Sequence, residues 1–157
     1  FVAGRPLDDD GSVLLRLEGG ARGVLWASQV AIDEENGLSL RVYGEKGSLE
    51  WHQEEPNTLL LKWPDRPREH LRTGGNYSRL SSAALGATRL PAGHPEGYIE
   101  AFANLYKSFA AALSEGSELD CPTVHDGVRG MAFIEACVSS SKAGGKWTRI
   151  ASWCVVK

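Results

Sequence analysis

The stretch that decides the fold is LSLRVYGEKGSLEWHQEEPNTLLLKW, residues 38–63. It contains three short runs, at 38–43, 48–52 and 58–63, in which an apolar side chain stands at every second position. This period of two is typical of β-strands with one covered face. Glycines at the 44–47 turn and Pro64 after the third run punctuate the pattern. The stretch therefore predicts consecutive antiparallel strands joined by short turns.

Strand patterns also flank this stretch on both sides. Val13, Leu15 and Leu17 share one face of the run 11–18, and Val24, Trp26 and Val30 share one face of the run 22–32, with Gly19-Gly20 between the two runs. Because glycine adopts positive φ readily, this pair favours a hairpin turn. A short sixth run is predicted around residues 68–72.

The second half of the chain predicts helices. Residues 73–93 read as a long irregular loop, rich in glycine, serine and proline. Apolar side chains then recur at intervals of three and four over residues 95–114, and a second helix is predicted over 124–142. The second helix opens on a capping-box pattern, Thr123 to Asp126. A final strand is predicted at 147–150.

Strands first and helices last predict the α+β class. We expect one domain over residues 1–157, with an open, mostly antiparallel β-sheet (11–72 plus 147–150) and helices packed on one face. The other face then lacks a cover. Trp26, Trp51 and Trp63 lie in or beside the strands, which favours a homo-oligomer contact through that face. The alternative is that these tryptophans belong to the core.

Length, charge and cysteine count exclude several classes of protein. The 157 residues suit one domain, and no apolar run approaches the ~20 residues that a membrane span needs. A net charge of -3 makes nucleic acid an unexpected partner. The three scattered cysteines, Cys121, Cys137 and Cys154, do not form a disulfide framework, which favours a cytoplasmic location.

The two ends of the chain carry weaker signals. The chain begins at Phe1 rather than Met, which suggests either a removed leader or a piece of a longer protein. The tail at 151–157 fits a terminal strand, an interface segment or a cloning remnant.

Several catalytic and cofactor motifs are absent from the sequence. No two of the 18 glycines stand at i and i+2, so G-x-G-x-x-G cannot occur. A P-loop, a nucleophile elbow, H-E-x-x-H and C-x-x-C are also missing. His94-Pro95-Glu96 matches half of the zinc deaminase motif, but the cysteine half is missing. We therefore expect no catalytic residue, no cofactor site and no metal site in this chain.

His94, Glu96 and Tyr98 are the candidate substrate-binding residues. They follow the long loop and stand at the predicted start of a helix. An imidazole, a carboxylate and a phenol together could hold a polyhydroxylated ligand by hydrogen bonds. The alternative is helix capping, with Glu96 placed favourably against the helix dipole and Tyr98 in the apolar stripe.

Several segments together resemble the Gfo/Idh/MocA oxidoreductase family, in one of its sugar-dehydrogenase-like branches. The most specific are GHPEGYIEAFANLY at 93–106 and PTVHDGVRGM at 122–131, followed by FIEA at 133–136. ASQV at 27–30, YGEKGSLEW at 43–51 and PNTL at 56–59 fit the same branch. The resemblance covers nearly the whole chain, in order.

This resemblance implies a two-domain enzyme, of which the chain is the C-terminal α+β domain without the N-terminal Rossmann domain that binds NAD or NADP. The family's catalytic lysine lies in a Glu-Lys-Pro motif of the nucleotide domain. Here Glu45-Lys46 is followed by Gly47, so the role is not transferred. The family's Asp, with a His four residues later, is also missing.

The resemblance further implies a substrate-binding and oligomerisation domain of an NAD(P)-dependent oxidoreductase that acts on a sugar, cyclitol or related polyol. The family's interdomain cleft lies near the loop before the long helix, which favours His94 as a substrate contact. The isolated chain is expected to be inactive and to bind no nicotinamide cofactor. Two alternatives stay open: a stand-alone binding or assembly module, and an independent acid–base pair of His94 and Glu96.

Overall fold

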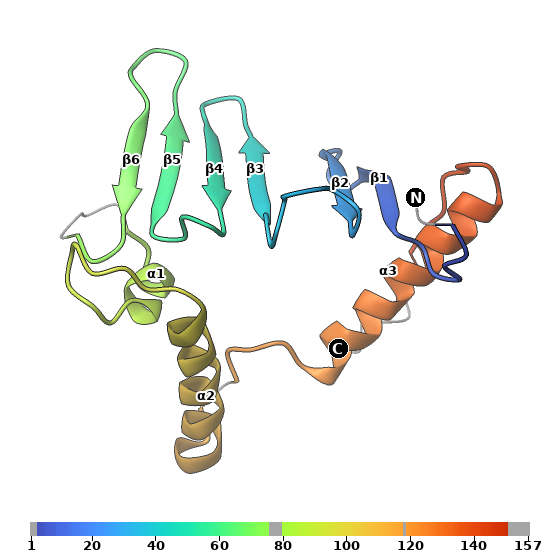
Figure 1. The fold of residues 1–157 in the computed structure, drawn as a ribbon. Helices are drawn as coiled ribbons and strands as arrows, with labels where there is room; N and C mark the ends of the chain where they lie inside the picture. Colours follow the sequence, from blue (N-terminus) through green and yellow to red (C-terminus); the bar gives the residue numbers. More distant parts are fainter. Residues whose placement is uncertain (1–2, 76–79, 118, 151–157) are drawn as a thin grey trace. The chain divides into compact units, whose positions relative to one another are not determined.

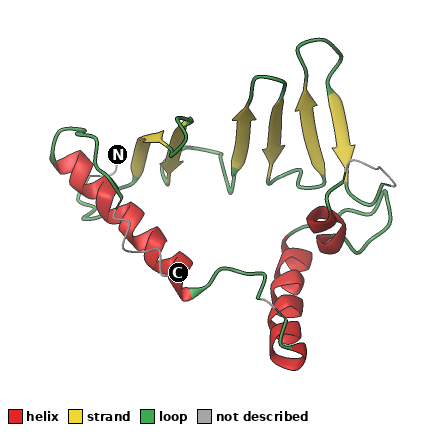
Figure 2. Cartoon of the chain, turned by 180° about the vertical axis from the view of Figure 1, so that it is seen from behind, coloured by secondary structure: helices red, strands yellow, loops and turns green. Residues whose placement is uncertain are grey.

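The computed structural model describes residues 3–75, 80–117 and 119–150. These residues form six strands followed by three helices, and every strand pairing among them is antiparallel (Figures 1 and 2). The α+β class predicted from the sequence is confirmed. The chain divides into two compact units, one of residues 34–121 and the other of residues 1–33 with 122–157. That residues 1–157 form one domain stays a prediction.

The larger unit contains a four-stranded sheet in the order β3-β4-β5-β6. Its strands are β3 (Ser39–Tyr43), β4 (Ser48–His52), β5 (Thr58–Lys62) and β6 (Glu69–Arg72). Each strand pairs with the next one along the chain, as short turns require. Figures 1 and 2 show both helices of this unit, α1 (Ser82–Ala87) and α2 (Tyr98–Glu115), at the same end of the strands.

The register of this sheet separates an apolar face from a charged face. Leu40 pairs with Trp51, which pairs with Leu59, and Leu49 pairs with Leu61. Leu61 is the one buried apolar side chain among the residues that the structure describes. On the opposite face Arg41 pairs with Glu50. The period-two pattern of the sequence thus sets which side chains meet.

The smaller unit contains a hairpin and one helix. The hairpin joins β1 (Asp10–Arg16) to β2 (Arg22–Ser28), and α3 spans Val124–Lys142, the range predicted from the sequence. Gly19 and Gly20 have φ of 87° and 92°, which explains why glycine stands at this turn.

Three predicted boundaries differ from the structure. Residues 147–150 form no strand. The ring of Trp147 instead packs against the guanidinium of Arg16, whose Cζ lies 4.0 Å from the ring centre. The predicted loop 73–93 contains α1, which begins because the Ser81 hydroxyl accepts a bond from the amide of Ala84. The long helix begins at Tyr98 rather than at residue 95.

The remaining sequence predictions concern the C-terminal tail, the cysteines and membrane-spanning segments. The tail at 151–157, with Cys154, is outside it. Cys121 and Cys137 are half-buried free thiols. No helix in the described ranges is long and apolar enough to cross a membrane.

Candidate functional site

The candidate site is the loop between α1 and α2, residues 88–97, which we call the His94 loop. Gly93 at its tip has φ of +87°, a conformation that other residues rarely adopt. His94 follows and is exposed. Its backbone amide donates to the carbonyl of Pro91 at 3.2 Å, and its Nδ1 lies 3.3 Å from the same oxygen.

The contact with Pro91 has a chemical consequence for the imidazole of His94. A carbonyl oxygen only accepts hydrogen bonds, so Nδ1 must carry the proton to bond it. In the neutral ring, Nε2 is then left as an acceptor. A hydroxyl group of a bound molecule is a donor that suits this nitrogen.

Glu96 is engaged with its own loop. Its carboxylate accepts from the amide of Arg89 at 3.0 and 3.2 Å and from the amide of Leu90 at 3.3 Å. The backbone of Glu96 is held as well, because the side-chain amide of Asn57 donates to the Glu96 carbonyl and accepts from the Glu96 N–H. Glu96 therefore closes the His94 loop on itself.

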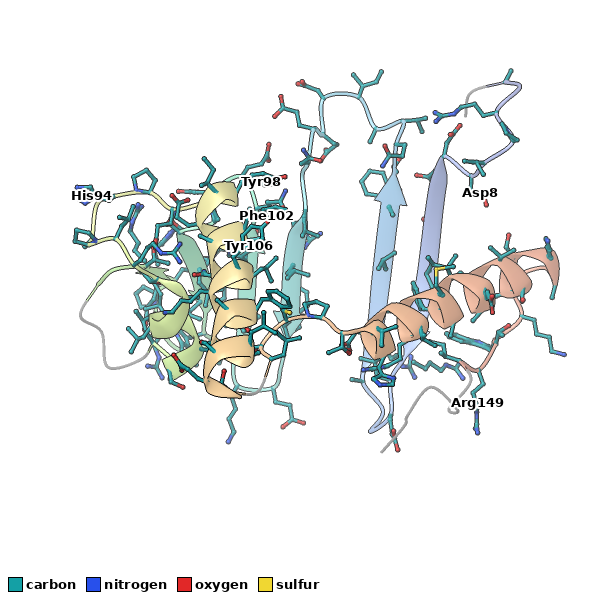
Figure 3. All side chains as sticks on the ribbon, turned by 90° about the horizontal axis from the view of Figure 1, so that it is seen from below. Asp8, His94, Tyr98, Phe102, Tyr106 and Arg149 are labelled. Carbon is teal, nitrogen blue, oxygen red and sulfur yellow. The ribbon has the colours of Figure 1, made fainter. Side chains whose placement is uncertain are left out.

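Tyr98 is the first residue of α2 and is 79% exposed. Its ring packs against Phe102, with centres 4.9 Å apart and planes tilted by 52°. Figure 3 shows Tyr98, Phe102 and Tyr106 along α2, while His94 lies apart on the loop. The three predicted site residues are close in sequence, but the Glu96 carboxylate bonds amides of its own loop and His94 lies apart from Tyr98.

The start of α2 explains this separation. Gly97 is the cap residue, and its amide donates to the Glu100 carboxylate at 2.8 Å. This bond is the main cause that lowers the pKa of Glu100. Because the helix begins after Gly97, His94 and Glu96 precede it and do not lie on its first turn.

Sequence reasoning missed three polar residues that hold this loop: Asn57, Arg89 and Asn104. The guanidinium of Arg89 donates to the Glu100 carbonyl at 3.1 Å and to Asn104 Oδ1 at 2.7 Å. Asn104 in turn donates to the Ala87 carbonyl at 2.9 Å. The spacing of apolar residues along a helix or strand does not reveal such polar contacts. For Asn57, the only local signal in the sequence is its place in the turn after Pro56.

Apart from the His94 loop, a cluster of charged side chains lies on the sheet, between β4 and β5. Lys62 and His52 both bond the carboxylate of Glu50, His52 at 2.9 Å. The hydrogen bond from Lys62 is the largest of the causes that lower the pKa of Glu50 to about 2, from an ordinary value of 4.5, and the hydrogen bond from His52 is the next. Within the described ranges, no group of three or more His, Cys, Asp or Glu side chains is arranged to hold a metal ion.

Comparison with known proteins gives the family. A Gfo/Idh/MocA family model, described as "Oxidoreductase family, C-terminal alpha/beta domain", matches residues 2–149. The chain belongs to this family of C-terminal oxidoreductase domains, as the sequence resemblance implied.

Among individual proteins, the chain is 35% identical over 156 residues to an uncharacterized oxidoreductase, YfiI, of Bacillus subtilis, covering 94% of this chain and 39% of that one. A crystal structure of an oxidoreductase from Sinorhizobium meliloti is 46% identical with a TM-score of 0.86, over 95% of this chain and 44% of that one. An inositol dehydrogenase homolog from Azotobacter vinelandii, complexed with NADH and myo-inositol, is 40% identical with a TM-score of 0.83, over 91% of this chain and 39% of that one. The chain thus spans less than half the length of each.

Proposed function

We propose that this chain is the substrate-binding and oligomerisation domain of an NAD(P)-dependent oxidoreductase that acts on a sugar, a cyclitol or a related polyol. The observation that carries the proposal is the 40% identity, at a TM-score of 0.83, to a homolog complexed with NADH and myo-inositol. Bound nicotinamide supplies hydride transfer in such enzymes, and the protein orients the substrate against it.

The residues of this chain do not fit a dinucleotide site. Every strand pairing in the described ranges is antiparallel, whereas the pyrophosphate of NAD is held at a glycine-rich turn of a parallel βαβ unit. The sequence has no G-x-G-x-x-G either. In the proposal, another part of the complete protein holds the nucleotide, and this domain contributes contacts to the substrate.

His94 is the proposed substrate contact. It is exposed, and its Nε2 is the acceptor left when Nδ1 bonds the Pro91 carbonyl. Glu96 and Tyr98 stay candidates with weaker support. The Glu96 carboxylate is engaged with the amides of Arg89 and Leu90, which also speaks against an acid–base pair with His94. Tyr98 offers a phenol on a residue that is 79% exposed.

Subunit contact through an exposed strand surface is the second part of the proposal. On one face of the β1–β2 hairpin, Leu14 pairs with Val24 and Ser12 pairs with Trp26. Leu14, Val24 and Trp26 are 66%, 76% and 58% exposed. Burial of such an apolar surface against a second copy of the chain removes it from water, which favours association.

The direct test is enzymatic. The complete protein that contains this chain is assayed for reduction of NAD or NADP with myo-inositol and a panel of other polyols and sugars. We expect turnover with one member of the panel, and neither turnover nor saturable NAD(P)H binding by residues 1–157 alone. Saturable binding of NADH by the isolated chain, or a complete protein that is inert toward the whole panel, would contradict the proposal.

A further inference from the structure

We propose that Asn57 and Gly74 are positioning residues that set the place of His94 from outside its loop. The inference rests on the proposed role of His94 as a substrate contact. Asn57 lies between β4 and β5, and Gly74 follows β6. Both are far from His94 in sequence, yet each contacts the His94 loop directly.

Asn57 holds the loop on the C-terminal side of His94. Its Nδ2 donates to the Glu96 carbonyl at 2.7 Å, and its Oδ1 accepts from the Glu96 amide at 3.0 Å. The same Oδ1 accepts from the Thr73 hydroxyl at 2.9 Å. The carboxamide of asparagine offers a separate donor and acceptor on a short side chain, whereas an aspartate carboxylate offers acceptors only.

Gly74 bounds the loop on the N-terminal side of His94. Its φ is +73°, and a Cβ placed on it would lie 2.6 Å from the backbone nitrogen of Ala92 and 2.9 Å from the carbonyl carbon of Pro91. A real Cβ essentially never lies this close to a non-bonded backbone atom, so any larger residue at 74 must push the loop away. Glycine is therefore required here for both its conformation and its size.

The two contacts bracket His94, which lies midway between Ala92 and Glu96. The backbone amide and Nδ1 of His94 both lie within bonding distance of the Pro91 carbonyl. Because of this, the imidazole must move with the loop. A shift at Gly74 or a lost bond at Asn57 is thus transmitted to the ring, although neither residue touches it.

The test compares Asn57→Ala, Asn57→Asp and Gly74→Ala in the complete protein. Asn57→Asp keeps the acceptor and loses the donor, so it replaces Asn57→Ala if that variant fails to fold. Gly19→Ala is the matched control, because Gly19 has φ of +87° and nothing within 4 Å of its added Cβ. It carries the same backbone strain without touching the His94 loop.

Two readouts are used. Amide hydrogen exchange over residues 88–97 reports the loop, and KM and kcat with myo-inositol and NAD as probes report the site. We expect exchange in the loop to rise about tenfold in Asn57→Ala and Gly74→Ala, and KM to rise about tenfold with kcat within about twofold. Gly19→Ala should change neither.

The outcomes separate this inference from the proposed function. Unchanged loop exchange in the Asn57 and Gly74 variants overturns the inference, and so does raised exchange with an unchanged KM. If the wild-type protein turns over no polyol, the proposed function fails. The NMR signal of the His94 ring, assigned with His94→Gln, then decides positioning: a shifted signal in both variants supports it, and an unshifted one overturns it.

Discussion

The side-chain amide of Asn57 bonds both backbone polar groups of Glu96, accepting from its N–H at 3.0 Å and donating to its carbonyl at 2.7 Å. These residues are 39 positions apart. This pair of bonds joins the turn between β4 and β5 to the residue just before the cap of α2. It explains why the long helix starts at Tyr98, since Glu96 is held outside the helix by a contact from the sheet.

The ion pair between β4 and β5 predicts a specific pH dependence. The folded pKa of Glu50 is about 2 against an ordinary 4.5, so the unfolded chain binds more protons between these values. The contribution of Glu50 to stability is therefore complete above about pH 4.5 and is lost as the pH falls through 2. The free energy of unfolding is measured in urea at pH 5.5 and at pH 3. Between these two pH values it should fall less for Glu50→Gln than for wild type.

The control for this experiment is Gln53→Ala, an uncharged change nearby. It removes the bond from Gln53 to the Asn36 carbonyl and should lower stability equally at both pH values. An identical pH dependence for wild type and Glu50→Gln would contradict the assignment of this titration to Glu50.

The turn between β3 and β4 should not tolerate a side chain at Gly47. An added Cβ would lie 2.9 Å from Cε3 of Trp63 and 3.0 Å from the Lys62 carbonyl oxygen. We expect Gly47→Ala to lower the free energy of unfolding by about 1–3 kcal/mol. Gly11→Ala is the control, because nothing lies within 4 Å of its Cβ. Equal stabilities of the two variants in urea would show that Trp63 does not pack on this turn.

The start of α3 should depend on Thr123. Its backbone amide and its hydroxyl both donate to the Asp126 carboxylate at 2.9 Å, and the backbone bond is the main cause that lowers the pKa of Asp126. We expect Thr123→Ala to cost about 1 kcal/mol of stability, as the loss of other N-caps does. Thr123→Ser should retain it. Loss of the same stability in the serine variant would contradict a role for the hydroxyl.

The exposed hairpin face predicts an effect on assembly. Val24→Lys places a charge on the surface that contains Leu14 and Trp26, so association should weaken at least about tenfold. Leu7→Lys, at a site that is 76% exposed outside any strand, should have no effect. Analytical ultracentrifugation of the complete protein measures both. A wild-type protein that is monomeric over a wide concentration range would refute the proposed contact.

Local patterns in the sequence predict the elements of this fold well. The alternating runs become β1 to β6, and the Thr123–Asp126 box marks the start of α3. These signals need only neighbouring residues. The start of α2 was predicted three residues early, because Pro95 suits a first helical turn while the distant Asn57 decides the boundary.

The candidate site was only partly predictable for the same reason. The position of His94 on a loop could be inferred from the glycines and prolines around it. The roles of Asn57, Gly74 and Arg89 depend on contacts between segments far apart in the sequence. The sequence pattern predicts a strand at 147–150, but these residues pair with no other strand in the described ranges. The ring of Trp147 packs against the guanidinium of Arg16 instead.

The most direct test of the proposed substrate contact is a kinetic comparison of His94→Ala with wild type in the complete protein, using NAD and whichever polyol of the panel proves to be a substrate. His70→Ala, a change on an exposed residue of β6, is the control. We predict that His94→Ala raises KM about tenfold or more while His70→Ala leaves it unchanged. An unchanged KM in His94→Ala would contradict the assignment of the His94 loop as part of the substrate site.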